Sequence, residues 1–250
     1  MTRLLASVTS VEEAELVLRA GADIVDLKDP ALGALGALSL TRIRAIVETV
    51  DGRRPVSATV GDLPADPDLI ARAVNDTAAT GVDFVKVGLF EPEYFDQCLH
   101  ALAYHAATGV RLVAVLFADR PPYPDVVARV ADAGLKGVML DTADKTGGGL
   151  RRHLSMTELS AFVAAARARG LLTGLAGSLR MADIGPLLAA DADYLGFRTA
   201  LCGGHARTAA VDPAAVAAIR ACLPRTGHYE TINIDMDSHD DRRIGRIDMA

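Results

Sequence analysis

Short apolar segments alternate with longer helical segments along almost the whole chain. The apolar segments have the length of buried strands, and the segments between them show the spacing of apolar residues that is typical of helices. Because parallel neighbouring strands need crossover connections, this order predicts a parallel sheet with helices outside it. Strands are predicted at 4–8, 23–27, 55–60, 84–88, 111–117, 137–141, 172–176 and 194–197. Helices are predicted at 11–20, 40–50, 66–80, 93–108, 125–133, 156–169, 181–190 and 213–223.

Eight such repeats predict one α/β domain, a closed (β/α)8 or TIM barrel over residues 1–225. An open, doubly wound sheet is the alternative. Residues 226–250 differ, because they carry histidines, aspartates and arginines with little apolar periodicity. We expect them to form a C-terminal tail or an arm, and their acidic residues lack the glycine and glutamate spacing of an EF-hand.

The composition favours an ordinary soluble protein and excludes some partners. The chain has 250 residues and a formal net charge of -6, with a pI of about 5.5, which gives no support to a nucleic-acid surface or a polybasic membrane patch. Three scattered cysteines suit a reducing compartment, and neither a signal peptide nor an apolar run of membrane-spanning length is visible. We therefore expect a cytoplasmic protein that binds a small molecule, with a homo-oligomer as a possible assembly.

Lysine is scarce, since only four of the 26 Lys and Arg residues are lysines. Three of the four, Lys28, Lys86 and Lys145, fall at carboxyl ends of predicted strands, where barrel active sites lie. Lys136 falls at the opposite end. Lysines are usually solvated surface charges, but Lys86 interrupts a strand that should be covered on both faces. The other polar residues at this rim are Ser7, Asp26, Thr59, Asp62, Asp119, Asp141, Ser178 and Arg198.

Two close amines among carboxylates suit imine chemistry. A partly buried lysine can be neutral and attack a carbonyl, whereas a guanidinium cannot. Asp26 stands two residues before Lys28, so both side chains should share one face of their strand. The histidines form no metal-binding pattern, and no P-loop or dinucleotide fingerprint follows a strand in the correct context. The sequence therefore predicts a catalytic centre with no metal and no cofactor.

Phosphate recognition is predicted at the loops after the seventh and eighth strands, which commonly hold phosphate in such barrels. The candidate residues there are Gly177, Ser178, Arg198, Gly203 and Gly204. For either loop alone, glycines that serve only tight turns explain the pattern equally well.

Six segments between about residues 21 and 204 together form a specific pattern: they read GADIVDLKDPALGALGA, PVSATVGDLP, GVDFVKVGLF, VMLDTADKTGGGL, LLTGLAGSLR and FRTALCGG. In these segments the chain resembles the (5-formylfuran-3-yl)methyl phosphate synthase family of methanofuran biosynthesis, also called 4-(hydroxymethyl)-2-furancarboxaldehyde-phosphate synthase. The resemblance implies a class I aldolase-like lyase that condenses two molecules of glyceraldehyde 3-phosphate with loss of phosphate and water. It also implies that Lys28 forms the imine, that Lys86 accepts the proton, and that Asp26, Asp141 and Lys145 assist.

One residue departs from the archaeal pattern of this family. After the fifth strand, Arg120 stands near the position where that pattern has a lysine, and it could replace the charge of that lysine but not its amine chemistry. Two alternatives to the family's reaction remain open from the residues. One is a class I aldolase that acts on another phosphorylated aldehyde or ketone, and the other is a non-catalytic barrel that binds a phosphorylated metabolite.

Overall fold

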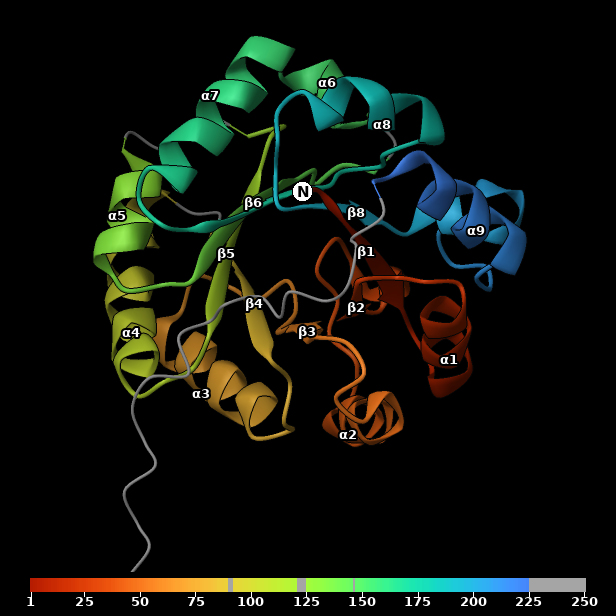
Figure 1. The fold of residues 1–250 in the computed structure, drawn as a ribbon. Helices are drawn as coiled ribbons and strands as arrows, with labels where there is room; N and C mark the ends of the chain where they lie inside the picture. Colours follow the sequence, from red (N-terminus) through yellow and green to blue (C-terminus); the bar gives the residue numbers. More distant parts are fainter. Residues whose placement is uncertain (90–91, 121–124, 146, 225–250) are drawn as a thin grey trace, which may run out of the picture.

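The computed structural model describes residues 1–89, 92–120, 125–145 and 147–224. The predicted tail, residues 226–250, lies outside the described residues. Figure 1 shows helices arranged around a central set of strands. No helix in the described ranges is both long enough and apolar enough to cross a membrane.

The sheet is a closed barrel of parallel strands in sequential order, which confirms the predicted (β/α)8 fold. The first strand pairs with the second and also with the last, Leu5 lying opposite both Ile24 and Gly196. This pairing rules out the open sheet, in which the two outer strands would stay unpaired. The strands are β1 (Arg3–Val8), β2 (Ile24–Leu27), β3 (Val56–Thr59), β4 (Phe84–Gly88), β5 (Leu112–Phe117), β6 (Gly137–Asp141), β7 (Leu172–Leu175) and β8 (Tyr194–Phe197).

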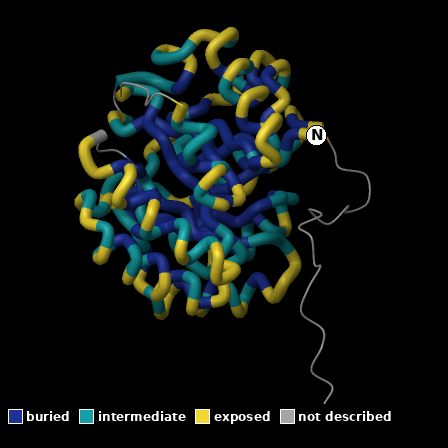
Figure 2. The backbone as a smooth tube through the Cα atoms, turned by 90° about the vertical axis from the view of Figure 1, so that its left-hand side faces the viewer, coloured by how far each residue is buried: buried dark blue, intermediate teal, exposed yellow. Residues whose placement is uncertain are grey.

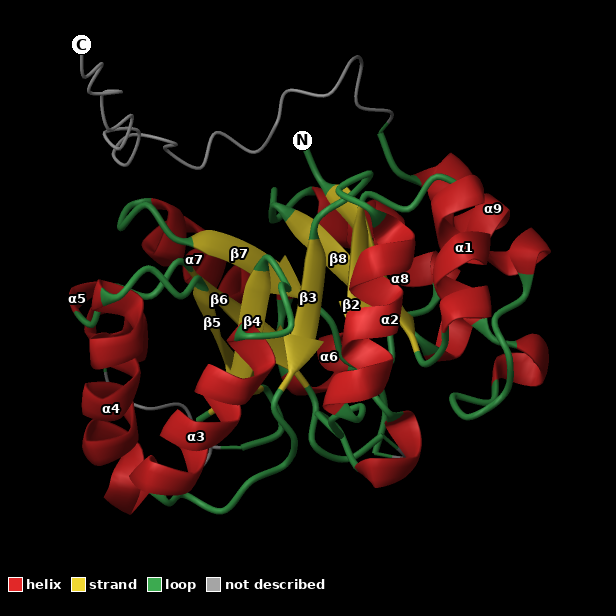
Figure 3. Cartoon of the chain, turned by 90° about the horizontal axis from the view of Figure 1, so that it is seen from below, coloured by secondary structure: helices red, strands yellow, loops and turns green. Residues whose placement is uncertain are grey.

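The helices follow the predicted segments with small shifts at their ends. Ser10 and Asp66 accept hydrogen bonds from the backbone N–H groups at the starts of α1 and α3, which explains why those helices begin there. The α-helices are α1 (Val11–Arg19), α2 (Leu40–Val50), α3 (Pro67–Ala78), α4 (Phe95–Ala107), α5 (Val126–Asp132), α6 (Leu150–His153), α7 (Met156–Arg167), α8 (Met181–Leu188) and α9 (Pro213–Cys222). Figure 3 shows the same elements from below.

Short elements that the sequence analysis did not predict lie in the loops. One is α6, a single turn that precedes α7. The others are the 3-10 turns η1 (Pro30–Leu32), η2 (Pro92–Tyr94), η3 (Thr199–Leu201) and η4 (Gly203–His205). Three of these turns, η1, η3 and η4, follow β2 or β8. The loops at the carboxyl ends of these two strands therefore contain helical turns and are not fully extended.

The apolar core has two layers, one between barrel and helices and one inside the barrel. Strand β2 shows how alternation divides them, because Val25 and Leu27 belong to the outer layer whereas Ile24 belongs to the inner one. The loop after β2 also contributes Leu35, which is 1% exposed, to the inner layer. Figure 2 shows the buried backbone at the centre and the exposed segments around it. The barrel is thus filled with side chains, and its polar residues gather at the carboxyl ends of the strands.

Candidate active site

Asp26 is the centre of a buried polar cluster that joins three neighbouring strands. The strand register places Ser7 of β1 and Ser57 of β3 directly beside it. Ser7 Oγ donates to Asp26 Oδ2 at 2.9 Å, and Ser57 Oγ donates to Asp26 Oδ1 at 2.6 Å. Lys86 of β4 adds an ion pair, with its Nζ 2.9 Å from Asp26 Oδ1. Asp26 is fully buried and Lys86 is 2% exposed, so this pair is shielded from water.

Asp26 remains ionised despite its burial. Desolvation by itself would raise the pKa of this carboxyl group, but the positive charges of Lys86 and Lys28 and the hydrogen bond from Ser57 outweigh that effect. The net result is a pKa below the ordinary value for aspartate. Asp26 and Lys86 therefore form a charged pair inside the barrel.

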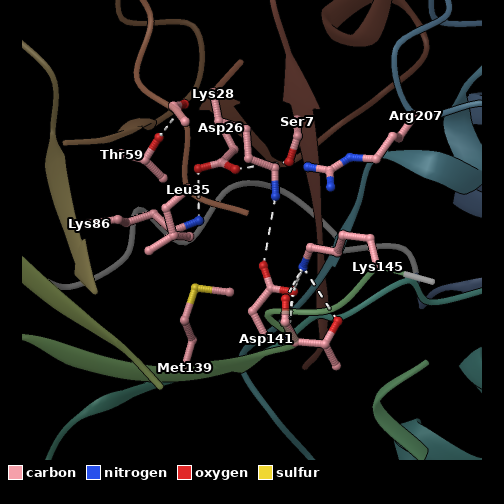
Figure 4. Close-up of polar contacts among 12 residues, drawn as sticks. Ser7, Asp26, Lys28, Leu35, Thr59, Lys86, Met139, Asp141, Lys145 and Arg207 are labelled. Atoms are coloured by element: carbon pink, nitrogen blue, oxygen red, sulfur yellow. Dashed lines mark hydrogen bonds and ion pairs between the residues drawn. The ribbon is translucent and has the colours of Figure 1, made fainter. Parts of the chain in front are cut away.

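Asp141, at the end of β6, is the centre of a second cluster. Its Oδ1 accepts hydrogen bonds from Lys145 Nζ at 2.5 Å and from the backbone N–H of Thr142 at 2.7 Å. Its Oδ2 lies 3.8 Å from Lys28 Nζ. Burial would raise the pKa of Asp141, but the charges of Lys145 and Lys28 lower it below the ordinary value. Figure 4 shows Lys28 and Lys145 approaching Asp141, while Lys86 lies at Asp26.

Lys28 differs from the other buried lysine in how its charge is supported. Desolvation is the largest influence and lowers the pKa of Lys28 to about 8, although Asp141 and Asp26 act in the opposite direction. A lysine with this pKa is roughly one-tenth neutral at pH 7, whereas an ordinary lysine is almost entirely protonated. Lys28 is therefore the described lysine best suited to attack a carbonyl group.

One cavity brings the predicted catalytic residues together. Its lining includes all five of them, Asp26, Lys28, Lys86, Asp141 and Lys145. The side chains of Asp26 and Lys28 reach the same space, as their spacing on one strand predicts. A carbonyl compound in this cavity would meet a partly neutral amine, two ionised carboxylates and two further ammonium groups.

The loop after β7 also lines this cavity through Gly177 and Ser178. Both residues have positive φ angles, 104° for Gly177 and 47° for Ser178. In the described part of the chain, their backbone N–H groups donate to no acceptor. Successive unpaired N–H groups can bind an anion, so the predicted phosphate role of these two residues is compatible with the geometry.

Arg198 also lines the cavity, but its guanidinium group is already occupied. It forms an ion pair with Glu13, in which the shortest contact is 2.6 Å. Its remaining N–H groups donate to the backbone oxygens of Ser7, Arg207 and Ala209. All five donors of an arginine are thus engaged, which leaves none for a substrate.

The remaining candidates lie outside the cavity lining. Gly203 and Gly204 form an exposed turn after β8, and the N–H of Gly203 donates to the backbone oxygen of Ala210. Arg120 is exposed, with its guanidinium carbon 5.4 Å from the ring centroid of Phe117. Their proposed roles in binding stay predictions, and we do not include these residues in the site.

Among the polar residues of this region that sequence reasoning missed are Ser57 and Arg207. Ser57 contacts Asp26, and the signal that could have identified it is its place opposite Asp26 in the strand register. Arg207 lines the cavity from the loop after β8, in a segment without periodicity that carries no local signal for its position.

Fold and site together define a TIM-barrel protein with a cavity lined by buried lysines and carboxylates. The family model described as 4-HFC-P synthase matches residues 4–220. A Methylorubrum extorquens protein, provisionally named (5-formylfuran-3-yl)methyl phosphate synthase, is 46% identical over 86% of this chain and 89% of its own length. The (5-formylfuran-3-yl)methyl phosphate synthase of Methanothermobacter thermautotrophicus is 36% identical over 88% of this chain and 98% of its own length. The chain therefore belongs to the 4-HFC-P synthase family.

A solved structure supports the fold independently. A 3-hexulose-6-phosphate synthase superimposes with a TM-score of 0.62 and 22% identity, covering 89% of this chain and all of the other. At this identity the likeness concerns the barrel alone.

Proposed function

We propose that this protein is a Schiff-base lyase that condenses two molecules of glyceraldehyde 3-phosphate into (5-formylfuran-3-yl)methyl phosphate. One phosphate and two water molecules leave, which balances the atoms. The family membership supports this product and a role in the biosynthesis of methanofuran or an analogue. The observation that carries the mechanism is the buried Lys28, whose Nζ lies 3.8 Å from an ionised Asp141 inside a cavity rich in cations.

The proposed sequence begins at Lys28. Its neutral amine attacks the aldehyde carbon of one triose phosphate, and the carbinolamine then loses water to give a protonated imine. To Asp141, which forms ion pairs with both Lys28 and Lys145, we assign the passing of protons between the two amines in these steps. The imine makes the protons on the adjacent carbon acidic, so that a carbon nucleophile can form there.

Lys86 and Asp26 provide the second acid–base pair. Their atoms lie 2.9 Å apart in a buried environment, so one proton can pass between them without solvent. We assign to this pair the removal of the proton beside the imine, with Lys86 as the group that contacts the substrate. The phosphate groups would be held in part by the backbone of Gly177 and Ser178.

Trapping with borohydride tests the imine. We expect intact-mass analysis and peptide mapping to find a reduced adduct on Lys28 after incubation with glyceraldehyde 3-phosphate. Lys28→Arg should abolish both adduct and turnover, because arginine keeps the charge but lacks the nucleophile. Lys136→Arg is the matched control, since Lys136 is exposed and precedes β6 at the opposite end of the barrel.

Full turnover in Lys28→Arg would refute the role of Lys28. Product identification then separates the furan synthase from an aldolase that acts on another phosphorylated aldehyde or ketone. The furan aldehyde should absorb in the near ultraviolet, which a simple aldol product does not.

A further inference from the structure

Arg207 differs from every other cation that lines the cavity. Among the described lining residues, five are cations and two are carboxylates. Lys86 pairs with Asp26, while Lys28 and Lys145 share Asp141. Arg198 pairs with Glu13, which is not one of the residues that line the cavity. Within the described ranges, Arg207 alone of these cations has no carboxylate in ion-pair contact.

The guanidinium group of Arg207 also has N–H donors that no acceptor in the described part of the chain uses. Its Nη2 donates to the backbone oxygen of Gly33 at 2.9 Å, in the loop after β2. The described part of the chain gives its other guanidinium N–H groups no acceptor. Figure 4 shows this side chain extending toward Ser7 and the end of Lys28. Arg207 is half-buried, so its position is held while part of the guanidinium faces the cavity.

We propose that Arg207 binds a phosphate group of the substrate through the free N–H groups of its guanidinium fork. A planar fork matches two oxygens of a phosphate monoester, which a lysine ammonium cannot do. Gly177 and Ser178 line the same cavity, and their backbone N–H groups, which have no acceptor in the described part of the chain, would add donors without adding charge. The sequence analysis assigned the phosphate contact to Arg198, whereas the hydrogen bonds leave Arg207 as the arginine with capacity for a ligand.

The substrate class in this proposal, a short phosphorylated aldehyde, rests on the proposed function. The contact itself can be tested without it, using glycerol 3-phosphate and inorganic phosphate. Both probes carry the phosphate, and neither has a carbonyl group that could form an imine. Binding is measured by titration calorimetry on the full chain, with melting temperatures recorded for every variant.

We expect Arg207→Gln to weaken binding of glycerol 3-phosphate by roughly 10- to 100-fold, the range for losing a charge-assisted contact. Arg207→Lys should lose less affinity because it keeps the charge. Arg44→Gln, which removes an exposed arginine on α2, is the matched control and should bind as the wild type does. In turnover assays Arg207→Gln should raise KM for the phosphorylated substrate more than it lowers kcat. A purely structural role would not produce this dependence on the phosphate group.

The proposal is overturned if a folded Arg207→Gln binds glycerol 3-phosphate with the affinity of the wild-type protein. It is also overturned if the wild-type protein does not bind glycerol 3-phosphate at millimolar concentration. If Arg207→Gln does not fold, the comparison is made on Arg207→Lys, where unchanged affinity and KM count against the proposal.

The proposed role of Arg207 and the proposed imine at Lys28 can fail separately. Normal phosphate binding by Arg207→Gln with an intact Lys28 adduct in the wild type refutes only the role of Arg207. Lost phosphate binding in the variant with no adduct in the wild type refutes only the imine.

Discussion

Lys28 and Lys86 are both buried lysines, but they differ in how closely each is paired with a carboxylate. Lys86 touches a carboxylate that two serines also hold, and this carboxylate is ionised. Lys28 lies 3.8 Å from Asp141, a group that it shares with the closer Lys145. Because the pairing of Lys28 is weaker, desolvation controls its pKa and favours the neutral amine.

The lowered pKa of Lys28 predicts how its reactivity depends on pH. The neutral amine is the reactive form, so reactivity should rise with pH and level off above about 8, the pKa of this side chain. The measurement is the rate at which trinitrobenzenesulfonate modifies Lys28, followed by peptide mapping from pH 6 to 11. Nα-acetyl-lysine amide serves as a control, with a midpoint near the ordinary value of about 10.4. A midpoint for Lys28 at that ordinary value would contradict the description of the site.

At the scale of elements, the loop between β2 and α2 closes part of the barrel mouth. Asp62 Oδ1 accepts the backbone N–H of Leu35 at 3.1 Å, and Thr59 Oγ1 donates to the backbone oxygen of Gly36 at 3.1 Å. These contacts seat Leu35 in the inner core, and Figure 4 shows its side chain beside that of Lys86. Burial of Lys28 and Lys86 therefore depends on a loop as well as on the strands that carry them.

Gly33, in this loop, has no room for a side chain and a backbone conformation that suits glycine. Its φ of 117° and ψ of -167° suit glycine alone, and an added Cβ would lie 1.9 Å from Asp62 Oδ2. We expect Gly33→Ala to displace the loop and reduce turnover at least about tenfold, since small misplacements at a site have effects of this size or more. Gly52→Ala is the control, because Gly52 also has a positive φ but open space around it. Equal activity of the two variants would show that the loop does not order the site.

For the whole molecule, the buried ion pair of Arg198 and Glu13 joins the segment after the last strand of the barrel to the first helix. Glu13 belongs to α1, whereas Arg198 follows β8, the strand that closes the barrel against β1. Burial would raise the pKa of Glu13, but hydrogen bonds from Arg198 and Thr9 together with the charge of Arg198 lower it. The pair is therefore charged, and it connects the two elements that follow β1 and β8, the strands whose pairing closes the barrel.

Arg198→Met should destabilise the folded protein by about 3–5 kcal/mol, because it leaves the carboxylate of Glu13 buried without its partner. Urea unfolding measures this difference. Replacing both residues, Glu13→Leu with Arg198→Met, should cost less than the single change, since no charge is then left unpaired. Arg19→Met, which breaks an exposed pair with Glu15, should change stability little. An effect of Arg198→Met as small as that of Arg19→Met would show that the buried pair does not stabilise the barrel.

The fold, and the residues that gather in the cavity, could be predicted because their signals are local. Alternation of strands and helices is visible within short segments, and Lys28 stands two residues after Asp26, directly past the end of the same strand. The ion pair of Arg198 with Glu13 has no such local signal. Its partner Glu13 lies 185 residues away, and only a closed barrel brings the two together. Arg207 was missed for the same reason, because its neighbour Gly33 is 174 residues distant.

The sequence by itself determined that this chain forms a barrel and that its scarce lysines gather at the carboxyl ends of the strands. These properties follow from periodicity and from the alternation of side chains, which are the same at every repeat. Tertiary structure decided which charges are paired and which are free. Ion pairing and desolvation depend on distances between strands and on the depth of burial, and neither is encoded in any single segment. The difference between Lys28 and Lys86, and that between Arg198 and Arg207, therefore exists only in the folded protein.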